Sequence, residues 1–540
     1  EIARQAIAMR SKTMPLKEIV RGSILDCHQV SLTDNYITKA LYASPYEIIK
    51  NYPDTGINNL SKEEKFYKLA LDLSQKVKIL NEKELIEKLN EAWEKGNSLV
   101  RLGHSLSTGD IKKINQSNIS GLAIAPLINR YEPSGFCQHI LGYVKNNGDS
   151  IGVAGIEKEY DNVLGKSRTS PQLISITDAK GTAIQGLMFK IVNNAENQAS
   201  VVLTIDKRIQ EIVEEVMNHK INKGAIVIMD VKSKEILALA SRPVFNPYNL
   251  PQALEDKDGP LTNRAMCPYH PGSLFKIFMA AAALEEKKVT IDDIFYCDGA
   301  YKFTDKLSTS CWKKEGHGDL NFTEAFAYSC NPVFIEVGLR LKKSKIEEYA
   351  EKFRLADETI NGWSQTRQAN SHVKINPGPA GIGNASLGQQ GVMLTPINIT
   401  NLIATIADNG RWGRPSMVKH IINKNGERQI IEKGPFAQVI SPDTARKVRT
   451  LMEEVVISGT GRTAKLPDLK LAGKTATSQT GNYRENEEIL NTWFGGYFPA
   501  DNPRWALVIL VEGGTSGAVD AAPLFKEIAD KILNSYSAIY

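Results

Sequence analysis

A serine and a lysine three residues apart, Ser273 and Lys276, are the side chains of this sequence best placed to do chemistry. Pro271 and Gly272 interrupt the chain just before the serine, and an apolar run over 274–284 that is typical of a buried helix follows it. The serine is therefore expected at or near a helix N-terminus, where free N–H groups favour negative charge. Residues three apart share a helix face, so the lysine amine is placed to take the hydroxyl proton. Alone, a serine at a helix start is more often a cap than a nucleophile.

Two further short motifs follow in the chain and strengthen the chemical interpretation. Ser329-Cys330-Asn331 precedes an apolar run over 333–337 and by itself is typical of a turn or a helix cap. Lys474-Thr475-Ala476 follows an apolar tripeptide and leads into a polar loop, which predicts an edge strand able to pair with an extended peptide. A lysine acts as a base only when burial or nearby positive charge lowers its pKa. Lys474 is the candidate source of that charge for Lys276.

In this order the three motifs resemble those of the penicilloyl-serine transferases, which comprise the penicillin-binding proteins and the serine β-lactamases. Segments 202–206 and 241–247 resemble the transpeptidase domain of class B penicillin-binding proteins, and 21–26 and 152–157 resemble their non-catalytic N-terminal module. The similarity spans nearly the whole chain. Segment 311–318 looks most like the elongation-type penicillin-binding protein 2, with the division-type enzyme as the nearest alternative.

This resemblance implies roles for the residues of the first two motifs. Ser273 would attack the carbonyl of the penultimate D-Ala of a peptidoglycan stem peptide, with Lys276 as its base. Ser329 would relay a proton between the two lysines and the leaving amine, and Asn331 would hydrogen-bond the substrate amide.

The third motif is implied to bind substrate. Lys474 and Thr475 suit the terminal carboxylate of the stem peptide, and the backbone N–H groups of Ser273 and Thr477 would form the oxyanion hole. The family usually has glycine where this chain has Ala476. We expect the alanine methyl to face the peptide slot from an exposed edge strand, so that Ala476→Gly changes acylation more than folding.

The resemblance also implies a function and its partners. The chain is expected to be a D,D-transpeptidase that cross-links stem peptides and is acylated by β-lactams. A separate glycosyltransferase is the expected partner, because no glycosyltransferase lobe is apparent. The alternatives are a sensor or scaffold protein that is acylated without cross-linking, and a β-lactamase, which the long N-terminal lobe disfavours.

Four potential metal ligands, Cys297, Cys311, His317 and Cys330, lie within one segment between the first two motifs. Three thiolates and an imidazole are a tetrahedral zinc set, although their spacing is not that of a zinc finger. Some penicillin-binding protein 2 enzymes bind zinc in this loop, and these four residues look like the matching positions. A Cys297–Cys311 disulfide and free thiols are the alternatives. No organic cofactor is expected.

The composition is that of an ordinary globular protein with several domains. At 540 residues the chain is too long for one core, and its net charge of +5 gives no support to nucleic-acid binding. No apolar stretch is long enough to span a membrane. The chain does not begin with Met, and we expect a single membrane-spanning helix before Glu1 that anchors it on the extracytoplasmic face of the cytoplasmic membrane.

Periodicity predicts an α+β protein of two parts, with a mixed pedestal over 1–200 and a transpeptidase domain over 201–540. In the first part a capping box at Ser61 predicts a helix, and a second helix is predicted over 82–93 with Trp93 on its apolar face. In the second part the sequence predicts a helix capped by Asp206 and two hairpins, over 225–240 and 493–511. A C-terminal helix is predicted from about residue 522. These elements imply an antiparallel sheet flanked by helices.

Overall fold

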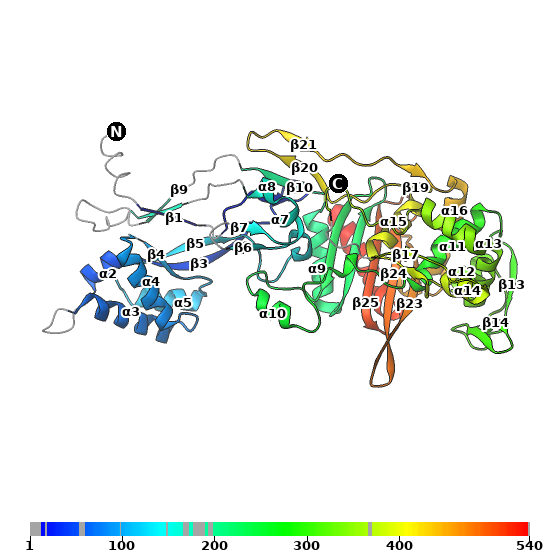
Figure 1. Cartoon of the computed structure of the whole chain (residues 1–540), viewed down its shortest axis with the longest axis horizontal. Helices are drawn as coiled ribbons and strands as arrows, with labels where there is room; N and C mark the ends of the chain where they lie inside the picture. The colour runs from blue at the N-terminus through cyan, green and yellow to red at the C-terminus, as the bar shows by residue number, and fades with distance from the viewer. Residues whose placement is uncertain are drawn as a thin grey trace.

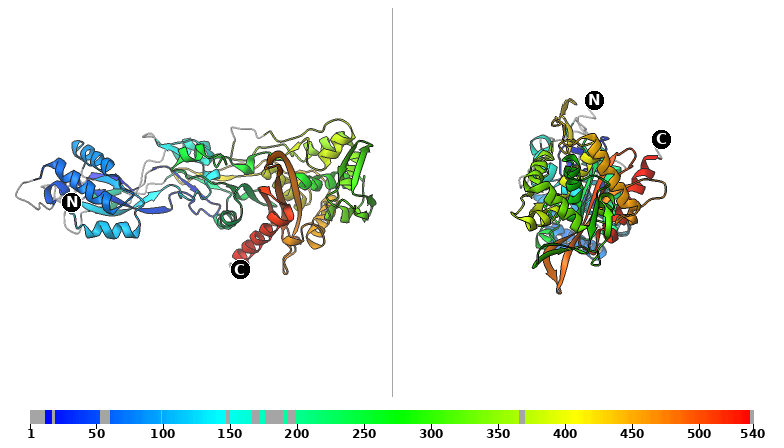
Figure 2. Two further views of the ribbon diagram at one scale, coloured as in Figure 1. Left: turned by 90° about the horizontal axis from the view of Figure 1, so that it is seen from below. Right: turned by 90° about the vertical axis from the view of Figure 1, so that its right-hand side faces the viewer.

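The computed structural model describes nearly the whole chain, in the ranges 12–16, 19–52, 60–97, 99–146, 150–165, 172–175, 189–192, 198–364 and 370–537. The molecule is elongated, with an N-terminal lobe at one end of the long axis and a larger C-terminal lobe at the other (Figures 1 and 2). Among the described helices, none is both long and apolar enough to cross a bilayer.

The far end of the N-terminal lobe is a three-stranded antiparallel sheet, in the order β4-β3-β5, packed against four helices. Its elements are β3 (Tyr36–Ala43), α2 (Pro45–Asn51), α3 (Lys62–Lys76), α4 (Glu82–Glu94), β4 (Val100–Gly103), α5 (Thr108–Gln116) and β5 (Leu122–Asn129). The predicted capping box at Ser61 opens α3. The prediction that Trp93 faces the core is wrong, because Trp93 is 36% exposed and Ala92 is buried in α4 instead.

Short elements connect this end of the lobe to the rest of the molecule. They are β1 (Lys12–Pro15), β2 (Ser23–Leu25), α6 (Gln138–Leu141), β6 (Val144–Asn146), β7 (Ser150–Gly152), α7 (Gly155–Glu159), α8 (Asp161–Leu164), β8 (Gln172–Ser175) and β9 (Phe189–Val192). Strands β1, β8 and β9 form one antiparallel sheet, and β6 pairs with β7.

The C-terminal lobe is built on a five-stranded antiparallel sheet in the order β12-β11-β25-β24-β23. The strands are β11 (Gly224–Asp230), β12 (Ile236–Arg242), β23 (Ala472–Arg484), β24 (Glu487–Phe498) and β25 (Trp505–Gly514). Helices α9 (Lys207–Lys220), capped by Asp206 as predicted, and α17 (Ala522–Ser537) share a hydrophobic core with this sheet. The predicted antiparallel sheet flanked by helices is confirmed.

A second, larger core lies between the sheet and a group of helices. These helices are α11 (Phe275–Glu285), α12 (Phe322–Ala327), α13 (Asn331–Lys352), α14 (Pro379–Ser386), α15 (Pro396–Ala407) and α16 (Pro442–Ile457). Helix α11 is buried on all sides, so its first turn is held rigidly in place. The remaining elements of the lobe are α10 (Leu250–Glu255), β13 (Ile294–Cys297), β14 (Ala300–Thr304), β15 (Leu307–Ser310), β16 (Gly318–Asn321), β17 (His372–Val373), β18 (Val392–Met393), β19 (Arg411–Trp412), β20 (Val418–Ile422), β21 (Arg428–Ile430) and β22 (Ala437–Gln438).

The two lobes are joined by a shared sheet. Strand β2 pairs in parallel with β10 (Ser200–Leu203), and β10 pairs on its other edge with β20 of the C-terminal lobe. Ile24 of β2 and Val201 of β10 are both fully buried in the core that also holds α11. The lobes therefore meet through backbone hydrogen bonds and a continuous apolar core.

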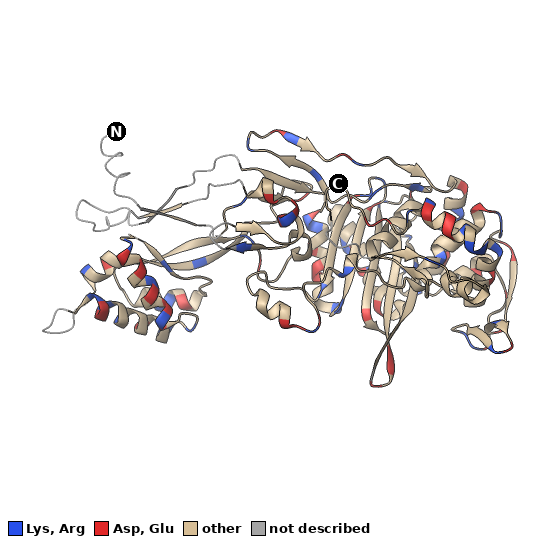
Figure 3. Cartoon of the chain, viewed as in Figure 1, with Lys and Arg blue, Asp and Glu red and all other residues tan. Residues whose placement is uncertain are grey.

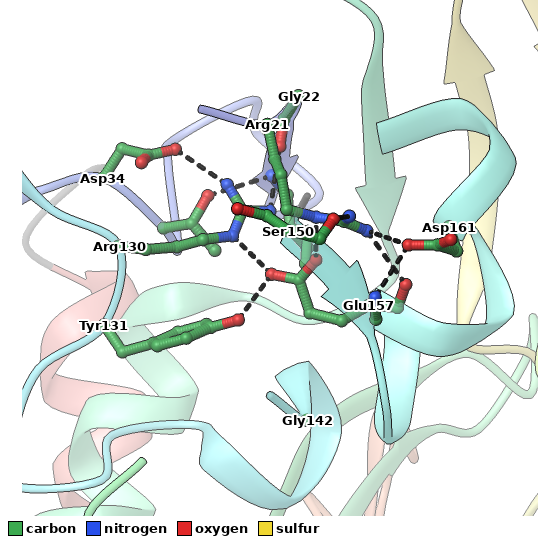
Figure 4. A network of polar contacts seen from close by, with 12 residues as sticks. Arg21, Gly22, Asp34, Arg130, Tyr131, Gly142, Ser150, Glu157 and Asp161 are labelled. Atoms are coloured by element: carbon green, nitrogen blue, oxygen red, sulfur yellow. Dashed lines mark hydrogen bonds and ion pairs between the residues drawn. The ribbon is translucent and has the colours of Figure 1, made fainter. Parts of the chain in front are cut away.

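A buried ion network lies within the N-terminal part of the chain, next to the strand β2 that forms this junction (Figure 4). The carboxylate of Glu157, in α7, accepts hydrogen bonds from Arg21 Nε at 2.9 Å, from Arg130 Nε and from the Tyr131 hydroxyl at 2.8 Å. Arg130 also pairs with Asp34 at 3.1 Å. Both guanidinium groups and the Glu157 side chain have no exposed surface. Removing one partner would leave a buried charge without its counter-charge, which strongly lowers the free energy of unfolding.

We therefore expect Glu157→Gln to lower the free energy of unfolding by about 3–5 kcal/mol. Urea denaturation followed by tryptophan fluorescence measures this loss. The matched control is Glu159→Gln, two residues along the same helix and exposed, for which we expect a change of at most about 0.5 kcal/mol. Equal effects of the two substitutions would contradict a structural role for the network.

Candidate active site

Ser273 lies on the floor of a cleft, at the start of α11 as predicted. A 3₁₀ turn, Gly272–Leu274, leads directly into the helix. Gly272 has φ +53°, and a Cβ there would lie 3.1 Å from the carbonyl oxygen of Thr477 in β23, so this turn requires glycine. The cleft has a volume of about 1120 Å³, and residues of all three motifs line it, namely Ser273, Ser329, Asn331, Thr475, Ala476 and Thr477.

A chain of short contacts joins the first two motifs. Lys276 is fully buried, and its Nζ donates to the Ser329 carbonyl at 2.8 Å and to Asn331 Oδ1 at 2.8 Å. The same Nζ lies 3.3 Å from Ser329 Oγ, which in turn lies 3.0 Å from Ser273 Oγ. The path from lysine to serine recorded in the structure therefore runs through the Ser329 hydroxyl. Ser329 holds this place with a left-handed backbone, φ +57°, which is uncommon outside glycine.

Both lysines have lowered pKa values, and burial is the main cause. Burial lowers the pKa of Lys276 to about 8, although the nearby Cys330 and Cys311 thiols act in the opposite direction. The pKa of Lys474, also fully buried, lies well below its usual value because of burial and the neighbouring Lys276 ammonium. Repulsion between the two lysines thus lowers the pKa of Lys474, whereas the sequence analysis expected Lys474 to lower the pKa of Lys276.

The third motif lies on β23, which is an edge strand of the five-stranded sheet as predicted. Thr477 is exposed in the cleft. The Thr475 hydroxyl lies 2.6 Å from that of Thr460, which also lines the cleft. Thr460 was missed by the sequence analysis because it follows α16 and belongs to none of the three motifs. A Ser-Gly-Thr-Gly turn after a long amphipathic helix, at 458–461, is the only signal that marks it.

The expectation that Ala476 presents its methyl from an exposed strand is wrong. Ala476 lines the cleft, but it is only 4% exposed and belongs to the main core, directly opposite Trp493 of β24. Gly517 packs on its backbone, since a Cβ at 517 would lie 2.6 Å from the Ala476 carbonyl oxygen. Strand β23 has a free backbone edge, but the two faces of the sheet are covered by other residues at this point. The Ala476 methyl therefore contributes to packing.

Ala476→Gly is accordingly expected to destabilise the protein by about 1–2 kcal/mol, from a lost buried methyl and a less restricted unfolded backbone. Thermal denaturation measures the effect, and labelling with a fluorescent penicillin shows whether acylation changes with it. Ala437→Gly, in the exposed strand β22, is the control for the backbone contribution alone. Equal losses for the two variants would restore the original expectation of an exposed methyl.

The four predicted metal ligands form one cluster, in which the three cysteines are buried and His317 is half-buried. The ligand atoms of Cys297, Cys311, His317 and Cys330 all lie within 4.8 Å of one another. Cys297 ends β13, Cys311 follows β15, His317 precedes β16, and Cys330 is the N-cap residue of α13. All six cysteines of the chain are free in the structure, so the Cys297–Cys311 disulfide is not formed there.

The cluster fits a tetrahedral metal ion. Cys311 Sγ lies 3.6 Å from His317 Nδ1. A sulfur and a nitrogen that bind the same tetrahedral zinc ion are expected to lie about 3.6 Å apart, so the observed distance fits such a site. The hydrogen bond between the two sulfurs lowers the pKa of Cys311 and, together with burial, raises that of Cys330, so the thiolate form of Cys311 is favoured. Thiolate character of this kind suits a cation.

The comparisons with known proteins identify the family. Residues 224–530 match the penicillin binding protein transpeptidase domain, and residues 17–188 match the penicillin-binding protein dimerisation domain. The chain belongs to the penicillin-binding proteins with a transpeptidase domain preceded by a dimerisation module, which are those of class B.

Individual relatives agree with this assignment. The chain is 30% identical to stage V sporulation protein D of Bacillus subtilis, over 96% of the chain and 78% of that protein. It is 26% identical to the peptidoglycan D,D-transpeptidase MrdA of Acinetobacter baumannii, over 96% and 81%. The crystal structure of the D,D-transpeptidase domain of a peptidoglycan glycosyltransferase from Eggerthella lenta superposes with a TM-score of 0.62 at 25% identity, covering 77% of this chain and 94% of that one. The protein is a serine D,D-transpeptidase of peptidoglycan synthesis.

Proposed function

We propose that Ser273 is the nucleophile of this transpeptidase and that Lys276 is its base, acting through Ser329. The contact chain from Ser273 Oγ to Ser329 Oγ at 3.0 Å and on to Lys276 Nζ at 3.3 Å carries this proposal. Hydroxyl hydrogens rotate freely, so the same chain can pass a proton in either direction. A neutral Lys276 then draws the proton of Ser273 through Ser329 as the serine attacks the penultimate D-Ala carbonyl.

The same groups complete the acyl transfer. The tetrahedral oxyanion is bound by the backbone N–H groups of Ser273 and Thr477, and each such donor is worth roughly 100- to 1,000-fold in rate. The proton held on Lys276 returns through Ser329 to the departing D-Ala amine, and the acyl-enzyme remains on Ser273. Lys474, with its lowered pKa, exchanges protons with this pair.

Substrate binding is assigned to the edge strand and to the second motif. A stem peptide laid along β23 pairs with its free backbone edge. The hydroxyls of Thr475 and Thr460, 2.6 Å apart, are placed to donate to the terminal carboxylate, and Ala476 contributes its backbone alone. Asn331, whose Oδ1 is held by Lys276, binds the amide of the donor peptide.

The proposal predicts how acylation depends on pH. The base must be neutral, and the pKa of Lys276 is lowered to about 8, so its neutral fraction rises from about pH 6 to pH 9 rather than only above pH 10. The acylation rate with a labelled penicillin should rise roughly 50- to 100-fold over that interval. Unfolding midpoints at both ends of the range provide the control. A flat profile, or a rise confined to pH values above 10, would rule out Lys276 as the base.

We propose that the Cys3His cluster holds a structural zinc ion. Zinc would cross-link the ends of β13 and β15, the turn before β16 and the start of α13, and it would supply no catalytic chemistry. Because Cys330 lies between Ser329 and Asn331, the ion would fix the second catalytic motif. The fit of the 3.6 Å sulfur–nitrogen distance to a tetrahedral site supports zinc.

We propose that the cellular role is cross-linking during cell-wall elongation, which the 311–318 segment supports by its resemblance to elongation-type enzymes. A sporulation role is the second candidate, favoured by the 30% identity to stage V sporulation protein D. Division-type cross-linking is the third. Depletion in the source organism separates them, since loss of rod shape, filamentation and failure of spore maturation are distinct phenotypes. Filamentation or a sporulation defect alone would overturn the elongation role.

We further propose that the pedestal comprises residues 1–200 and the transpeptidase domain residues 201–540, a division supported by the two family matches. The protein would work on the extracytoplasmic side of the cytoplasmic membrane, because its stem-peptide substrate lies there. It would act beside a separate glycosyltransferase and be trapped by β-lactams as an acyl-enzyme.

A further inference from the structure

A second cavity adjoins the catalytic cleft. It has a volume of about 1220 Å³ and lies between the projecting β23–β24 hairpin, the end of β25 and the segment that precedes Ser273. Four residues line both spaces, His270, Gln479, Thr480 and Glu488. The two cavities are therefore neighbours that share a wall, and Glu488 and His270 lie in that wall.

His270 is oriented so that one ring nitrogen is an acceptor. Its Nδ1 lies 2.8 Å from the carbonyl oxygen of Val392 in β18. A carbonyl oxygen only accepts, so Nδ1 carries the hydrogen and Nε2 of the neutral ring keeps its lone pair. His270 precedes Ser273 by three residues in the chain, and it lines both cavities.

The wall of the second cavity carries excess negative charge. Its Lys223 is paired with Asp258 at 3.2 Å. Glu488 accepts hydrogen bonds from Gln479 Nε2 at 2.8 Å and from the backbone N–H of Gly481 at 3.1 Å, which hold its carboxylate in place. Glu485, Glu487 and Glu488 also line this cavity, and none of the side chains that the structure describes forms a salt bridge with them. Figure 3 shows acidic positions on this hairpin.

The second half of the reaction needs such a site. The acyl group on Ser273 occupies the cleft, and the nucleophile that resolves it is a primary amine on another peptide. That amine is an ammonium ion at neutral pH. It must be attracted, deprotonated and brought to the acyl carbonyl from outside the space that the donor peptide fills.

We propose that the second cavity binds the acceptor peptide, with Glu488 attracting its ammonium group and His270 Nε2 accepting one proton from it. This inference rests on the function proposed for Ser273. The neutral amine attacks the ester carbon, the C–N bond forms and the bond from carbon to Ser273 Oγ breaks. The amine's second proton passes to Ser273 Oγ, and the proton on His270 leaves to solvent, so the step balances without a further reactant.

The test separates acceptor binding from acylation. A D-alanyl thioester donor acylates the full chain, and product analysis measures how much acyl group passes to water and how much to an added acceptor. The acceptors are a lysine-containing peptide, which is cationic, and hydroxylamine, which is uncharged at neutral pH. For Glu488→Gln we expect the KM for the cationic peptide to rise about tenfold and that for hydroxylamine to change by less than about twofold. The matched control is Glu432→Gln, exposed and outside both cavities, with neither KM changed.

A second variant keeps the test decisive if Glu488→Gln disturbs the hairpin. His270→Asn keeps a donor for the Val392 carbonyl and removes Nε2. We expect its transfer rate to the peptide amine to fall at least about tenfold more than its acylation rate. Equal changes for both acceptors in Glu488→Gln, together with equal losses of transfer and acylation in His270→Asn, would overturn the proposal. Absence of any acyl-enzyme on Ser273 in the unsubstituted protein would instead overturn the function on which it rests.

Discussion

Ser273→Ala is expected to lose covalent labelling by penicillin, with an acylation rate about a million-fold lower, the scale seen when a serine nucleophile is removed from a hydrolase. We expect that the neighbouring Ser329 hydroxyl, 3.0 Å away, does not take over, because it lies between Ser273 and Lys276 in the chain of contacts and not at the start of α11. Intact-mass spectrometry after incubation with a penicillin measures the adduct. Because Ser273 is only half-buried, the unfolding midpoint should change little.

Ser308→Ala, on the exposed strand β15 and outside the cleft, is the control and should label like the unsubstituted protein. A stoichiometric adduct on the Ser273 variant would show that another residue is the nucleophile. An adduct on the unsubstituted protein that decays within minutes would favour a β-lactamase, because hydrolysis of the acyl-enzyme is the property that separates the two classes.

The second large effect concerns the metal. Protein purified without chelator should contain one equivalent of zinc, and Cys297→Ser should reduce this below about a tenth of an equivalent. We expect the variant to lose several kcal/mol of stability, with about 10 kcal/mol as the upper guide from small zinc-binding peptides. Acylation should slow as well, since Cys330 is both a proposed ligand and the residue between Ser329 and Asn331. Elemental analysis, denaturation and penicillin labelling give the three measurements.

Cys267→Ser is the matched control, because Cys267 is partly buried but lies outside the cluster. Its zinc content and acylation rate should equal those of the unsubstituted protein. A protein without zinc, in which two cysteines resist alkylation until they are reduced, would establish the disulfide alternative.

The sequence was sufficient to locate the three motifs and to predict the helices and strands that carry them, because helix and strand formation depends largely on local residue patterns. The apolar run after Ser273, the capping box at Ser61 and the Asp206 cap all gave elements at the expected positions. The predicted ends of strands were less accurate where a strand continues into polar residues. Strand β24 begins at Glu487 and not near Trp493, since hairpin pairing with β23 extends beyond the buried part of the sheet.

What the sequence could not predict depends on contacts between distant segments. The route from Lys276 to Ser273 through Ser329 follows from the left-handed backbone of Ser329 and from how α13 packs on α11. Ala476 is buried because Trp493, on another strand, lies against it. The place of Thr460 beside Thr475 is likewise set by tertiary packing.

The parallel pairing of β2 with β10 has a consequence for how the protein unfolds. The two family matches divide the chain near residue 200, yet the backbone of β10 is bonded to a strand about 180 residues earlier and to β20 about 220 residues later. A fragment cut along the family boundary would leave β10 with an unpaired edge and part of the main core open to water, a known route to aggregation. Residues 19–32 are thus part of the cooperative folding unit of the C-terminal lobe, and a soluble fragment must include them.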